Sequence, residues 1–241
     1  MQPILNIAIH AARQAGDIIL RHIELIDRIK VNSKGVNDFF SEVDVKAEQA
    51  IIQTIHKLHP NHGIIAEESG ISNLDADCVW IIDPLDGTKN FLHGFPFYCV
   101  SIAIRIKGSI EHAVVYDPLR HECFSATRGR GARLDDRRLR VSKQTQLKDS
   151  LVACATPIPS CGGSRKTGSA ALDLAYVASG RLDGFYENSL KIWDIAAGCL
   201  IVREAGGLLS DKHGKDGYLE SGEVVASTPK IFKALLQSLN A

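Results

Sequence analysis

The amino-acid sequence predicts a layered α/β sandwich built around a mixed β-sheet. Three observations support this fold class. The first 60 residues show helical periodicity, the following segments are short and β-branched, and the rest of the chain alternates between the two patterns. This order is typical of helices that pack on the faces of a sheet. The 241 residues suffice for one large domain or two closely packed ones.

Two amphipathic helices are predicted at the start of the chain. Apolar residues recur at helical spacing from Pro3 to about Arg28, and again from Asp44 until Pro60. We expect Asp44 to cap the second helix and the proline to end it. The intervening segment 31–43 breaks the period and is predicted to form a loop or hairpin.

Strands are predicted in the middle of the chain, where apolar, β-branched segments are separated by Gly, Pro or charged turns. These segments are 63–66, 78–82, 97–106, 110–116 and 123–126. Helices are then predicted at 169–178 and 194–205, short strands at 183–186, 208–210 and 224–226, and a last helix from Pro229. We expect a single domain over 1–241, with a division into 1–150 and 151–241 as the alternative.

Composition and charge exclude several classes of protein. Hydrophobic residues make up 45% and charged residues 23%, which excludes disorder and coiled coil. The 28 basic and 28 acidic residues balance, so neutralising nucleic-acid phosphate is not the expected main role. The six cysteines are scattered without a C-x-x-C pair, so we expect reduced thiols. No apolar run reaches the ~18 residues of a membrane span and no signal peptide is evident, which predicts a cytoplasmic protein without a membrane partner.

The segment 83–88 carries the densest chemistry. A predicted buried strand leads into Asp83, and Pro84 is expected to end it. The turn would bring together Asp83, Asp86 and the Leu85 carbonyl, and such oxygen donors suit Mg²⁺ better than zinc or copper. Gly87 and the residue after it would begin a short helix whose N–H groups bind an anion beside the metal. The alternative is a helix-capped turn without a ligand.

Two further acidic turns add to this segment. Glu67 follows the strand 63–66, and Asp194 begins a predicted helix with small residues. Together with Asp83 and Asp86 they carry four negative charges, enough to hold two Mg²⁺ ions and still admit a phosphate dianion. Two ions about 3.5–4 Å apart are the arrangement of in-line phosphoryl transfer. Without metal the carboxylates would repel one another, which predicts raised pKa values.

These three segments, in this order along the chain, resemble the signatures of the inositol monophosphatase family. The resemblance runs nearly end to end and is strongest to the bacterial extragenic-suppressor branch. It rests on Glu67-Glu68-Ser69, on Asp83-Pro84-Leu85-Asp86-Gly87-Thr88 and on Trp193-Asp194-Ile195-Ala196-Ala197-Gly198. The resemblance implies a five-layer αβαβα sandwich, Mg²⁺-dependent hydrolysis of a phosphomonoester, inhibition by lithium and a homodimer.

The resemblance also implies residue roles. One metal would bind Glu67, Asp83 and the Leu85 carbonyl, a second would bind Asp83, Asp86 and Asp194, and a third, weaker ion has a place near Glu67. The catalytic residues would be Glu67, Thr88 and Asp44, with the attacking water on the first metal oriented by Thr88 and by Asp44 behind it. The substrate-binding positions would be Asp86, Gly87, Thr88, Gly168, Ser169, Ala170 and Glu187. The segment 34–41 matches the mobile catalytic loop of the family.

Three departures from the family pattern bear on the substrate. Lys89 replaces the threonine that is commonest in this branch, and Thr-Lys resembles relatives that act on adenosine bisphosphates or histidinol phosphate. Ser41 stands where threonine is usual and keeps the hydroxyl. Between Ala155 and Arg165 the chain lacks about one helix and its loop compared with the family, close to the substrate mouth and the dimer face.

Several functions remain open from the sequence. The first candidate is hydrolysis of myo-inositol 1-phosphate, a small phosphorylated polyol, and Glu187 favours a polyol because a carboxylate would repel a second phosphate. Alternative substrates are 3′-phosphoadenosine 5′-phosphate, histidinol phosphate and fructose 1,6-bisphosphate. A different role is association with RNA polymerase or RNA, as for related bacterial proteins. The basic stretch 128–140 could serve it, or could form a solvated hairpin.

Overall fold

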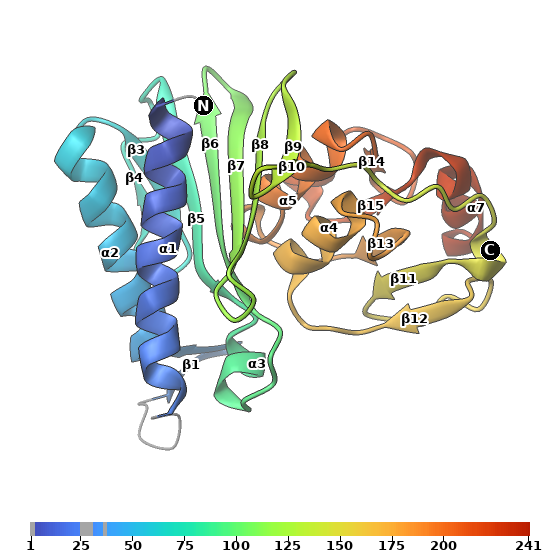
Figure 1. Cartoon of the computed structure of the whole chain (residues 1–241), viewed down its shortest axis with the longest axis horizontal. Coiled ribbons are helices and arrows are strands. Elements are labelled where there is room, and N and C mark those ends of the chain that lie inside the picture. The colour runs from blue at the N-terminus through green and yellow to red at the C-terminus, as the bar shows by residue number, and fades with distance from the viewer. Residues whose placement is uncertain (1–2, 25–30, 36–37) are drawn as a thin grey trace.

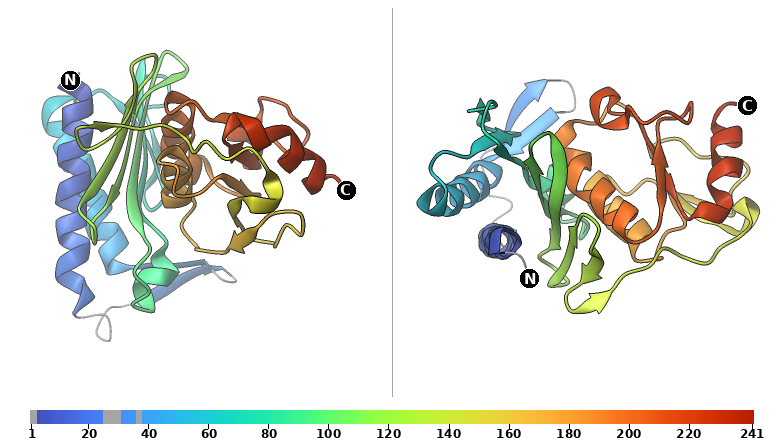
Figure 2. Two further views of the ribbon diagram at one scale, coloured as in Figure 1. Left: turned by 45° about the vertical axis from the view of Figure 1, so that its right-hand side comes forward. Right: turned by 90° about the horizontal axis from the view of Figure 1, so that it is seen from above.

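The protein is a five-layer αβαβα sandwich, described by a computed structural model for residues 3–24, 31–35 and 38–241 (Figure 1). Helices α1 (Pro3–Ile23) and α2 (Glu42–Leu58) form the first layer, and an eight-stranded sheet forms the second. Helices α4 (Ala170–Ala178) and α5 (Ile192–Glu204) lie between this sheet and a five-stranded sheet. Helix α7 (Pro229–Leu239) covers the outer face, and the view from above in Figure 2 shows the layers in this order. The predicted fold class is confirmed.

The eight-stranded sheet is mostly antiparallel. Its order is β10-β9-β8-β7-β6-β5-β3-β4, and β3 pairs with β5 in parallel. Its strands are β3 (Gly63–Ala66), β4 (Gly70–Ser72), β5 (Cys78–Asp86), β6 (Cys99–Ile106), β7 (Ser109–Asp117), β8 (Glu122–Thr127), β9 (Gly131–Leu134) and β10 (Arg137–Arg138). The parallel pair brings the carboxyl ends of β3 and β5 to the same edge of the sheet, and this edge positions the candidate site.

The five-stranded sheet has the order β12-β11-β13-β15-β14, with β11 parallel to both of its neighbours. Its strands are β11 (Leu151–Cys154), β12 (Gly163–Arg165), β13 (Gly184–Glu187), β14 (Leu208–Ser210) and β15 (Val224–Ser227). The smaller elements are the hairpin β1 (Val31–Gly35) and β2 (Asp38–Ser41), helices α3 (Thr88–Leu92) and α6 (Tyr218–Ser221), and a 3₁₀ turn at Leu147–Asp149.

Side-chain alternation along β5 explains how the large sheet is covered on both faces. Trp80 and Ile82 pack with α1 and α2, whereas Val79 and Ile81 pack with α4 and α5. All four side chains are buried, as the period of two along a strand requires when both faces are covered. A third apolar cluster lies between α7 and the five-stranded sheet.

The structure differs from the predicted element boundaries at several points. Helix α1 ends at Ile23, and the rest of the segment predicted to be helical up to about Arg28 lies largely outside the described residues. Ser41, not Asp44, is the N-cap of α2, because the serine hydroxyl accepts the Val43 N–H. Strand β5 does not end at Pro84 but continues to Asp86 through an irregularity in its pairing with β6.

The connection between β11 and β12 is short. Residues 155–162 form turns and bends, with no helix among them, and β12 then returns parallel to β11. Parallel strands usually need a crossover of a dozen or more residues that contains a helix. In place of the helix that the family pattern would have here, the structure has a compact crossover at the sheet edge.

The helices of the structure are those of a layered globular fold. Within residues 3–24, 31–35 and 38–241, none is both long enough and apolar enough to cross a bilayer. The expected single domain stays a prediction, although one apolar core contains Phe124 and Ile81 from one side of residue 150 and Phe185 and Ile195 from the other.

Candidate active site

Two acidic turns meet where β3 and β5 end. The parallel register pairs Ala66 with Ile82, so Glu67, which follows β3, and Asp83, which lies within β5, are neighbours. The Glu67 amide donates a hydrogen bond to the Ile82 carbonyl at 3.2 Å. Glu67 is therefore held beside Asp83, as the sequence predicted from the strand ends.

Asp83 is almost fully enclosed at this edge, with 2% of its surface exposed. Its Oδ1 accepts the Leu85 N–H at 3.0 Å, which shapes the turn toward Asp86. Burial raises the pKa of Asp83 well above its usual value, and the nearby charges of Glu67, Asp86 and Asp194 raise it further. Carboxylates from three separated segments thus act on one another electrostatically at this place.

Asp86 faces the start of α4. Its Oδ2 accepts the Ser169 hydroxyl and the Ala171 N–H, both at 2.7 Å, and lies 3.8 Å from the Cys99 thiol. Burial raises the pKa of Asp86 to about 6 although these hydrogen bonds favour the charged form. The first turn of α4 therefore binds one oxygen of the carboxylate that the sequence assigned to both metal and substrate.

Asp194 reaches the same edge through α5. Ser101, which pairs with Asp83 across β5 and β6, donates a hydrogen bond from its hydroxyl to the Trp193 carbonyl at 3.1 Å. Asp194 is the third residue of α5, whereas the sequence predicted it to be the first, and its Oδ2 accepts the Lys191 N–H at 2.7 Å. Burial, followed by the charge of Asp86, raises the pKa of Asp194 to about 7.

Two of the predicted catalytic residues, Thr88 and Asp44, are joined by a hydrogen bond. The Thr88 hydroxyl donates to Asp44 Oδ1 at 2.8 Å and also lies 3.0 Å from the Leu85 carbonyl oxygen. Asp44 is fully buried, and its Oδ2 accepts both the N–H and the hydroxyl of Ser41. Burial is the main cause of its raised pKa. Asp44 thereby links α2 to the turn that carries Thr88.

Gly87 takes a conformation that suits glycine. Its φ of +94° lies in the left-handed region, and a Cβ there would come 3.0 Å from the Phe97 carbonyl oxygen. Gly87 is the N-cap of the five-residue helix α3, as expected from the sequence. Because α3 is so short, an anion would be bound by the N–H groups of its first turn and not by a helix macrodipole.

The other predicted substrate-binding residues lie around Asp86. Ser169 is buried and bonded to Asp86, and Ala170 begins α4 beside it. Gly168 precedes them with a φ of +85°. Burial, then the charge of Asp86, raises the pKa of Glu187 at the end of β13, while Lys166 lowers it.

The site residues fit a hard divalent cation by their chemistry. The donors gathered here are carboxylate oxygens whose pKa values are raised, as charge counting predicted, although burial is the largest cause. Repulsion between carboxylates adds to burial for Asp83 and Asp194. A bound cation would offset that repulsion. The nearby Cys99 thiol has a pKa well above its usual value because it is buried, so a thiolate ligand for a softer metal is not favoured.

The carboxylates are nevertheless engaged in protein hydrogen bonds. Asp83, Asp86 and Asp194 each accept a backbone N–H. Within the part of the chain that the structure describes, no three His, Cys, Asp or Glu side chains are arranged to hold a metal ion as they stand. Because a carboxylate has about four acceptor sites, these bonds leave each of the three able to bind a cation as well.

Sequence reasoning missed several residues that build the site. Asn90 ties α3 to the segment before α4, because its Nδ2 donates to the carbonyls of Phe97 and Thr167. Asp173 is buried on α4, and its Oδ1 is the one buried polar side-chain atom without a partner in the described chain. Glu48 accepts two N–H groups of the turn after Glu67. The sequence signal that could have revealed Glu48 is an acidic residue on the apolar face of a predicted helix.

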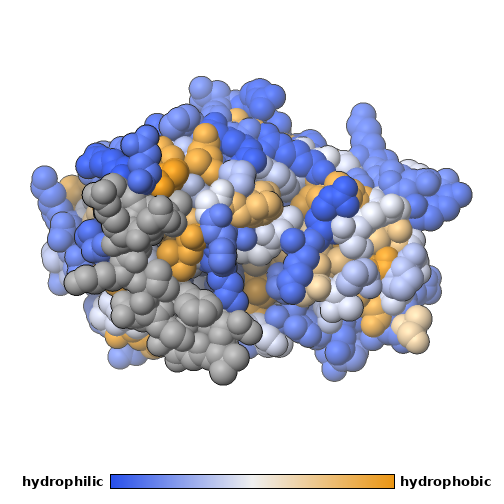
Figure 3. Space-filling view, turned by 90° about the horizontal axis from the view of Figure 1, so that it is seen from below, coloured by the Kyte–Doolittle hydropathy of each residue, from blue (hydrophilic) through white to orange (hydrophobic). Residues whose placement is uncertain are grey.

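The site lies at the end of the molecule where α3 and the β1–β2 hairpin are found (Figure 1). Figure 3 views the molecule from this end, and hydrophobic residues appear there as small separate areas among hydrophilic ones. The predicted mobile segment 34–41 belongs to this end, but residues 36–37 lie outside the described part of the chain. Its predicted role in closure stays a prediction.

Comparison with known proteins identifies the family. The whole chain, residues 1–241, matches the inositol monophosphatase family, and it belongs to that family. A relative from Pseudomonas aeruginosa named Nus factor SuhB is 49% identical over 261 residues, covering 99% of this chain and 96% of the relative.

Solved structures agree with this assignment. The extragenic suppressor protein SuhB from Bartonella henselae is 40% identical with a TM-score of 0.96, covering 99% of this chain and 98% of that chain. A Thermotoga maritima IMPase is 33% identical with a TM-score of 0.92, covering 99% and 97%. The Pseudomonas alignment runs over 261 residues against 241 in this chain, which supports a deletion here.

Proposed function

We propose that this protein is a Mg²⁺-dependent phosphomonoester hydrolase that acts on myo-inositol 1-phosphate. The observation that carries the proposal is the electrostatic coupling of buried Asp83 to Glu67, Asp86 and Asp194, which come from three segments of the chain. Membership of the inositol monophosphatase family supports phosphatase activity. Inhibition by lithium and assembly as a homodimer are part of the proposal, and they too are supported by family membership.

The proposed ligands divide into two groups. Glu67, Asp83 and the Leu85 carbonyl would hold one Mg²⁺, and Asp83, Asp86 and Asp194 a second, with a third and weaker ion near Glu67. When bound, the metal supplies Lewis-acid activation of water and neutralises charge on the phosphate. Two ions balance the four carboxylates, so a phosphate dianion would not meet an excess of negative charge.

The protein's own groups would orient the reactants. Because the Thr88 hydroxyl donates its proton to Asp44 Oδ1, its oxygen remains able to accept a hydrogen bond from the attacking water. The N–H groups of Gly87 and Thr88 would hold the phosphate. Glu187, beside Asp86, would accept hydroxyl hydrogen bonds from a polyol.

Hydrolysis of myo-inositol 1-phosphate with and without Mg²⁺, repeated with lithium, tests the proposal. Asp83→Asn and Asp194→Asn are expected to lower kcat/KM by more than ~100-fold, the upper end for residues that merely support a metal ligand. Asp75→Asn, an exposed carboxylate before β5, is the control and should leave the rate unchanged. Full Mg²⁺-dependent activity in both site variants would refute the assignment.

A panel of phosphomonoesters tests the substrate. Lys89 keeps 3′-phosphoadenosine 5′-phosphate, histidinol phosphate and fructose 1,6-bisphosphate as candidates, since an exposed cation at the start of α3 suits a second charge. Initial rates should rank inositol 1-phosphate first if Glu187 disfavours a second phosphate. A bisphosphate that is hydrolysed faster would replace it as the substrate.

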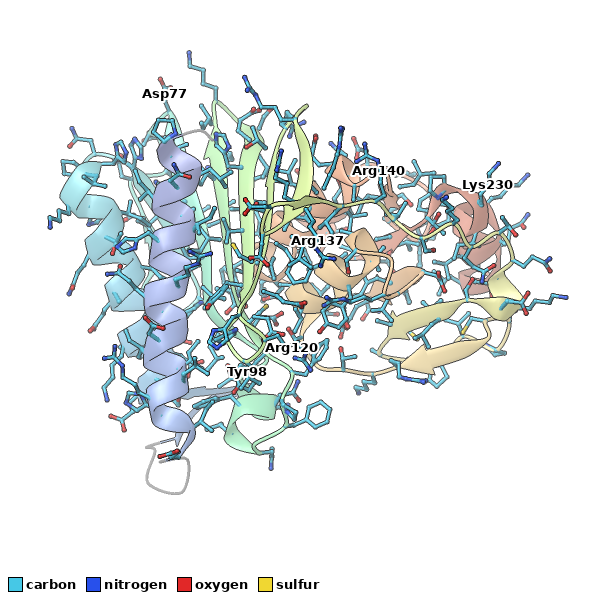
Figure 4. The ribbon with its side chains drawn as sticks, in the orientation of Figure 1. Asp77, Tyr98, Arg120, Arg137, Arg140 and Lys230 are labelled. Atoms are coloured by element: carbon cyan, nitrogen blue, oxygen red, sulfur yellow. The ribbon has the colours of Figure 1, made fainter. Side chains whose placement is uncertain are left out.

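We propose a second, non-catalytic role as a partner of RNA polymerase or RNA, because relatives carry the name Nus factor. The structural observation in its favour is that β10 consists of two exposed arginines, Arg137 and Arg138, on the edge of the large sheet. Figure 4 shows Arg137 and Arg140 on the segment that crosses from this sheet toward the second half of the chain. This places the basic stretch 128–140 on the surface, where a solvated hairpin remains the alternative.

Removing Arg137 and Arg138 separates this role from catalysis. The double alanine variant should bind an RNA or polymerase partner more weakly, with a smaller dependence on salt, and keep the phosphatase rate. Conversely, the Asp83→Asn protein should still bind the partner. Unchanged affinity and salt dependence in the double variant would rule out this surface.

A further inference from the structure

Glu48 is a buried carboxylate that no predicted role has used. It lies on the apolar face of α2, with 2% of its surface exposed. Its Oε2 accepts the Glu68 N–H at 2.8 Å, and its Oε1 accepts the Ser69 N–H at 2.7 Å. Hydrogen bonds to a charged acceptor are roughly twice as strong as neutral ones, so this is a firm attachment of the turn to the helix.

These bonds fix the backbone immediately after Glu67. The Glu67 N–H is bonded to the Ile82 carbonyl of β5, and the next two N–H groups are bonded to Glu48. The peptide units on both sides of Glu67 are therefore held, one by the sheet and one by α2. This leaves the Glu67 side chain to be directed toward Asp83, whose pKa its charge raises.

Helix α2 makes a second attachment one turn earlier. Asp44 and Glu48 are four residues apart and lie on the same face of the helix. Asp44 accepts the hydroxyl of Thr88, while Glu48 accepts the two amides that follow Glu67. One rigid helix thus sets the spacing between the turn after β3 and the turn after β5.

We infer that Glu48 is a positioning residue: by holding the Glu68 and Ser69 amides it orients Glu67 for a divalent cation. The inference rests on the proposed function, because it assigns Glu67 as a metal ligand. It predicts that the charge of Glu48 matters for metal affinity although its carboxylate points at backbone. A Gln side chain would place an NH₂ group against one of the two N–H donors and lose that bond.

The chain contains a matched control for this interaction. Glu204 at the end of α5 also accepts two amides of a turn, those of Gly129 and Gly131, at 2.8 and 2.7 Å. That turn joins β8 to β9. Glu204 is ten residues beyond Asp194 on one helix, which places it ~15 Å away along the axis. Glu204→Gln therefore makes the same chemical change in a turn far from the carboxylates.

The experiment compares Glu48→Gln, Glu204→Gln and the wild-type protein. Hydrogen exchange of the metal-free proteins should show faster exchange at residues 68–69 in the first variant and at 129–131 in the second. Titration calorimetry with Mn²⁺ should show affinity reduced by ~10- to 100-fold in Glu48→Gln, the range for residues that support a metal ligand. Affinity should be unchanged in Glu204→Gln. At saturating Mg²⁺ the kcat of Glu48→Gln should recover most of the wild-type value.

A Glu48→Asp variant covers the case in which Glu48→Gln does not fold. It keeps the charge but shortens the side chain, so its Mn²⁺ affinity should lie between that of Glu48→Gln and that of the wild-type protein. If Glu48→Gln, or Glu48→Asp when the former is unfolded, binds Mn²⁺ as wild type does, the inference is overturned and the contact is structural only. A wild-type protein that neither binds Mn²⁺ nor hydrolyses a phosphomonoester would overturn the proposed function itself, and this inference with it.

Discussion

Asp44 and Asp194 occupy the same position in their helices, the third residue, and each accepts the N–H of the residue before the helix. This placement stabilises a helix start by about 0.5–2 kcal/mol, as a capping interaction does. It also fixes one carboxylate oxygen. The other oxygen of Asp44 is bonded to Thr88. Both residues therefore combine a structural bond with the role that the proposed mechanism gives them.

A second residue-scale feature is the bond between Trp80 and His62. The indole N–H of fully buried Trp80 donates to His62 Nδ1 at 3.0 Å, and the His62 ring stacks on His59 with centroids 4.3 Å apart. Since an indole nitrogen can only donate, His62 must be neutral with its proton on Nε2. Burial, then the charge of His59, lowers the pKa of His62 below its usual value.

This bond predicts a pH dependence of stability. Because the pKa of His62 is lowered on folding, the unfolded chain binds the proton more tightly. Stability therefore rises with pH between the pKa of His62 in the folded protein and its pKa in the unfolded chain. The contribution is complete above pH ~6.5 and is lost as pH falls through the folded pKa. His62→Gln should cost about 1 kcal/mol at pH 7.5, the usual value of one hydrogen bond, and less at pH 5.

Urea unfolding of both proteins at the two pH values measures this difference. His10→Gln, at an exposed position of α1, is the control and should show no pH-dependent difference. A His62→Gln cost that is the same at pH 5 and pH 7.5 would contradict the assigned tautomer.

At the scale of elements, the contact between α4 and α5 sets the site. Each helix begins at the edge where the carboxylates meet: α4 binds Asp86 with its first turn, and α5 carries Asp194. They approach closely at Gly198, where a Cβ would come 2.6 Å from the Leu174 Cβ. The small residues of the segment 193–198 therefore permit close packing, as predicted from the sequence.

Gly198→Ala should destabilise the protein. The added methyl group must separate two helix backbones, which costs ~1–3 kcal/mol and outweighs the ~1 kcal/mol that alanine gains over glycine in a helix. Urea unfolding should show a net loss of up to about 2 kcal/mol. Gly217→Ala is the matched control, because no heavy atom lies within 4 Å of a Cβ there. A Gly198→Ala protein as stable as wild type would contradict the close contact.

Long periodic elements and some short apolar strands, such as β3 and β15, were predictable, whereas five other very short strands were not. The helix from Pro3 and the strands 110–116 and 123–126 carry enough apolar repeats to indicate their type. Strands β4, β9, β10, β11 and β12 have two to four residues each, and tertiary pairing rather than local pattern defines them. Pro84 misled the prediction because an irregularity in the β5–β6 pairing accommodates a residue without an N–H.

The site residues were predictable where the acidic side chains lie close together in the sequence. Asp83 and Asp86 flank one turn, and Glu67 ends the neighbouring strand. Glu48 and Ser101 could not be predicted, because they act through the backbone of residues distant in sequence. Only the fold shows which amide or carbonyl each side chain reaches.

At the scale of the whole molecule, the proposed metal ions would join two layers. Glu67 and Asp83 lie at the edge of the large sheet, and Asp194 lies on a helix between the two sheets. The two ions, which share Asp83, would stabilise the folded state alone, because the unfolded chain does not assemble the ligands. At 100-fold excess over Kd this stabilisation is ~2.7 kcal/mol.

Mg²⁺ should therefore raise the Tm by ~2–4 °C for each kcal/mol gained, the scale for chains of this length. Thermal unfolding with increasing MgCl₂ at constant ionic strength measures the effect. The Asp83→Asn protein should show a much smaller rise. An equal rise in both proteins would place the stabilising ion elsewhere.

The most direct test is a crystal structure with Mn²⁺, in which anomalous scattering locates the ions. The account predicts manganese bonded to oxygens of Glu67, Asp83, Asp86 and Asp194. A well-occupied ion bound only at other residues would contradict it.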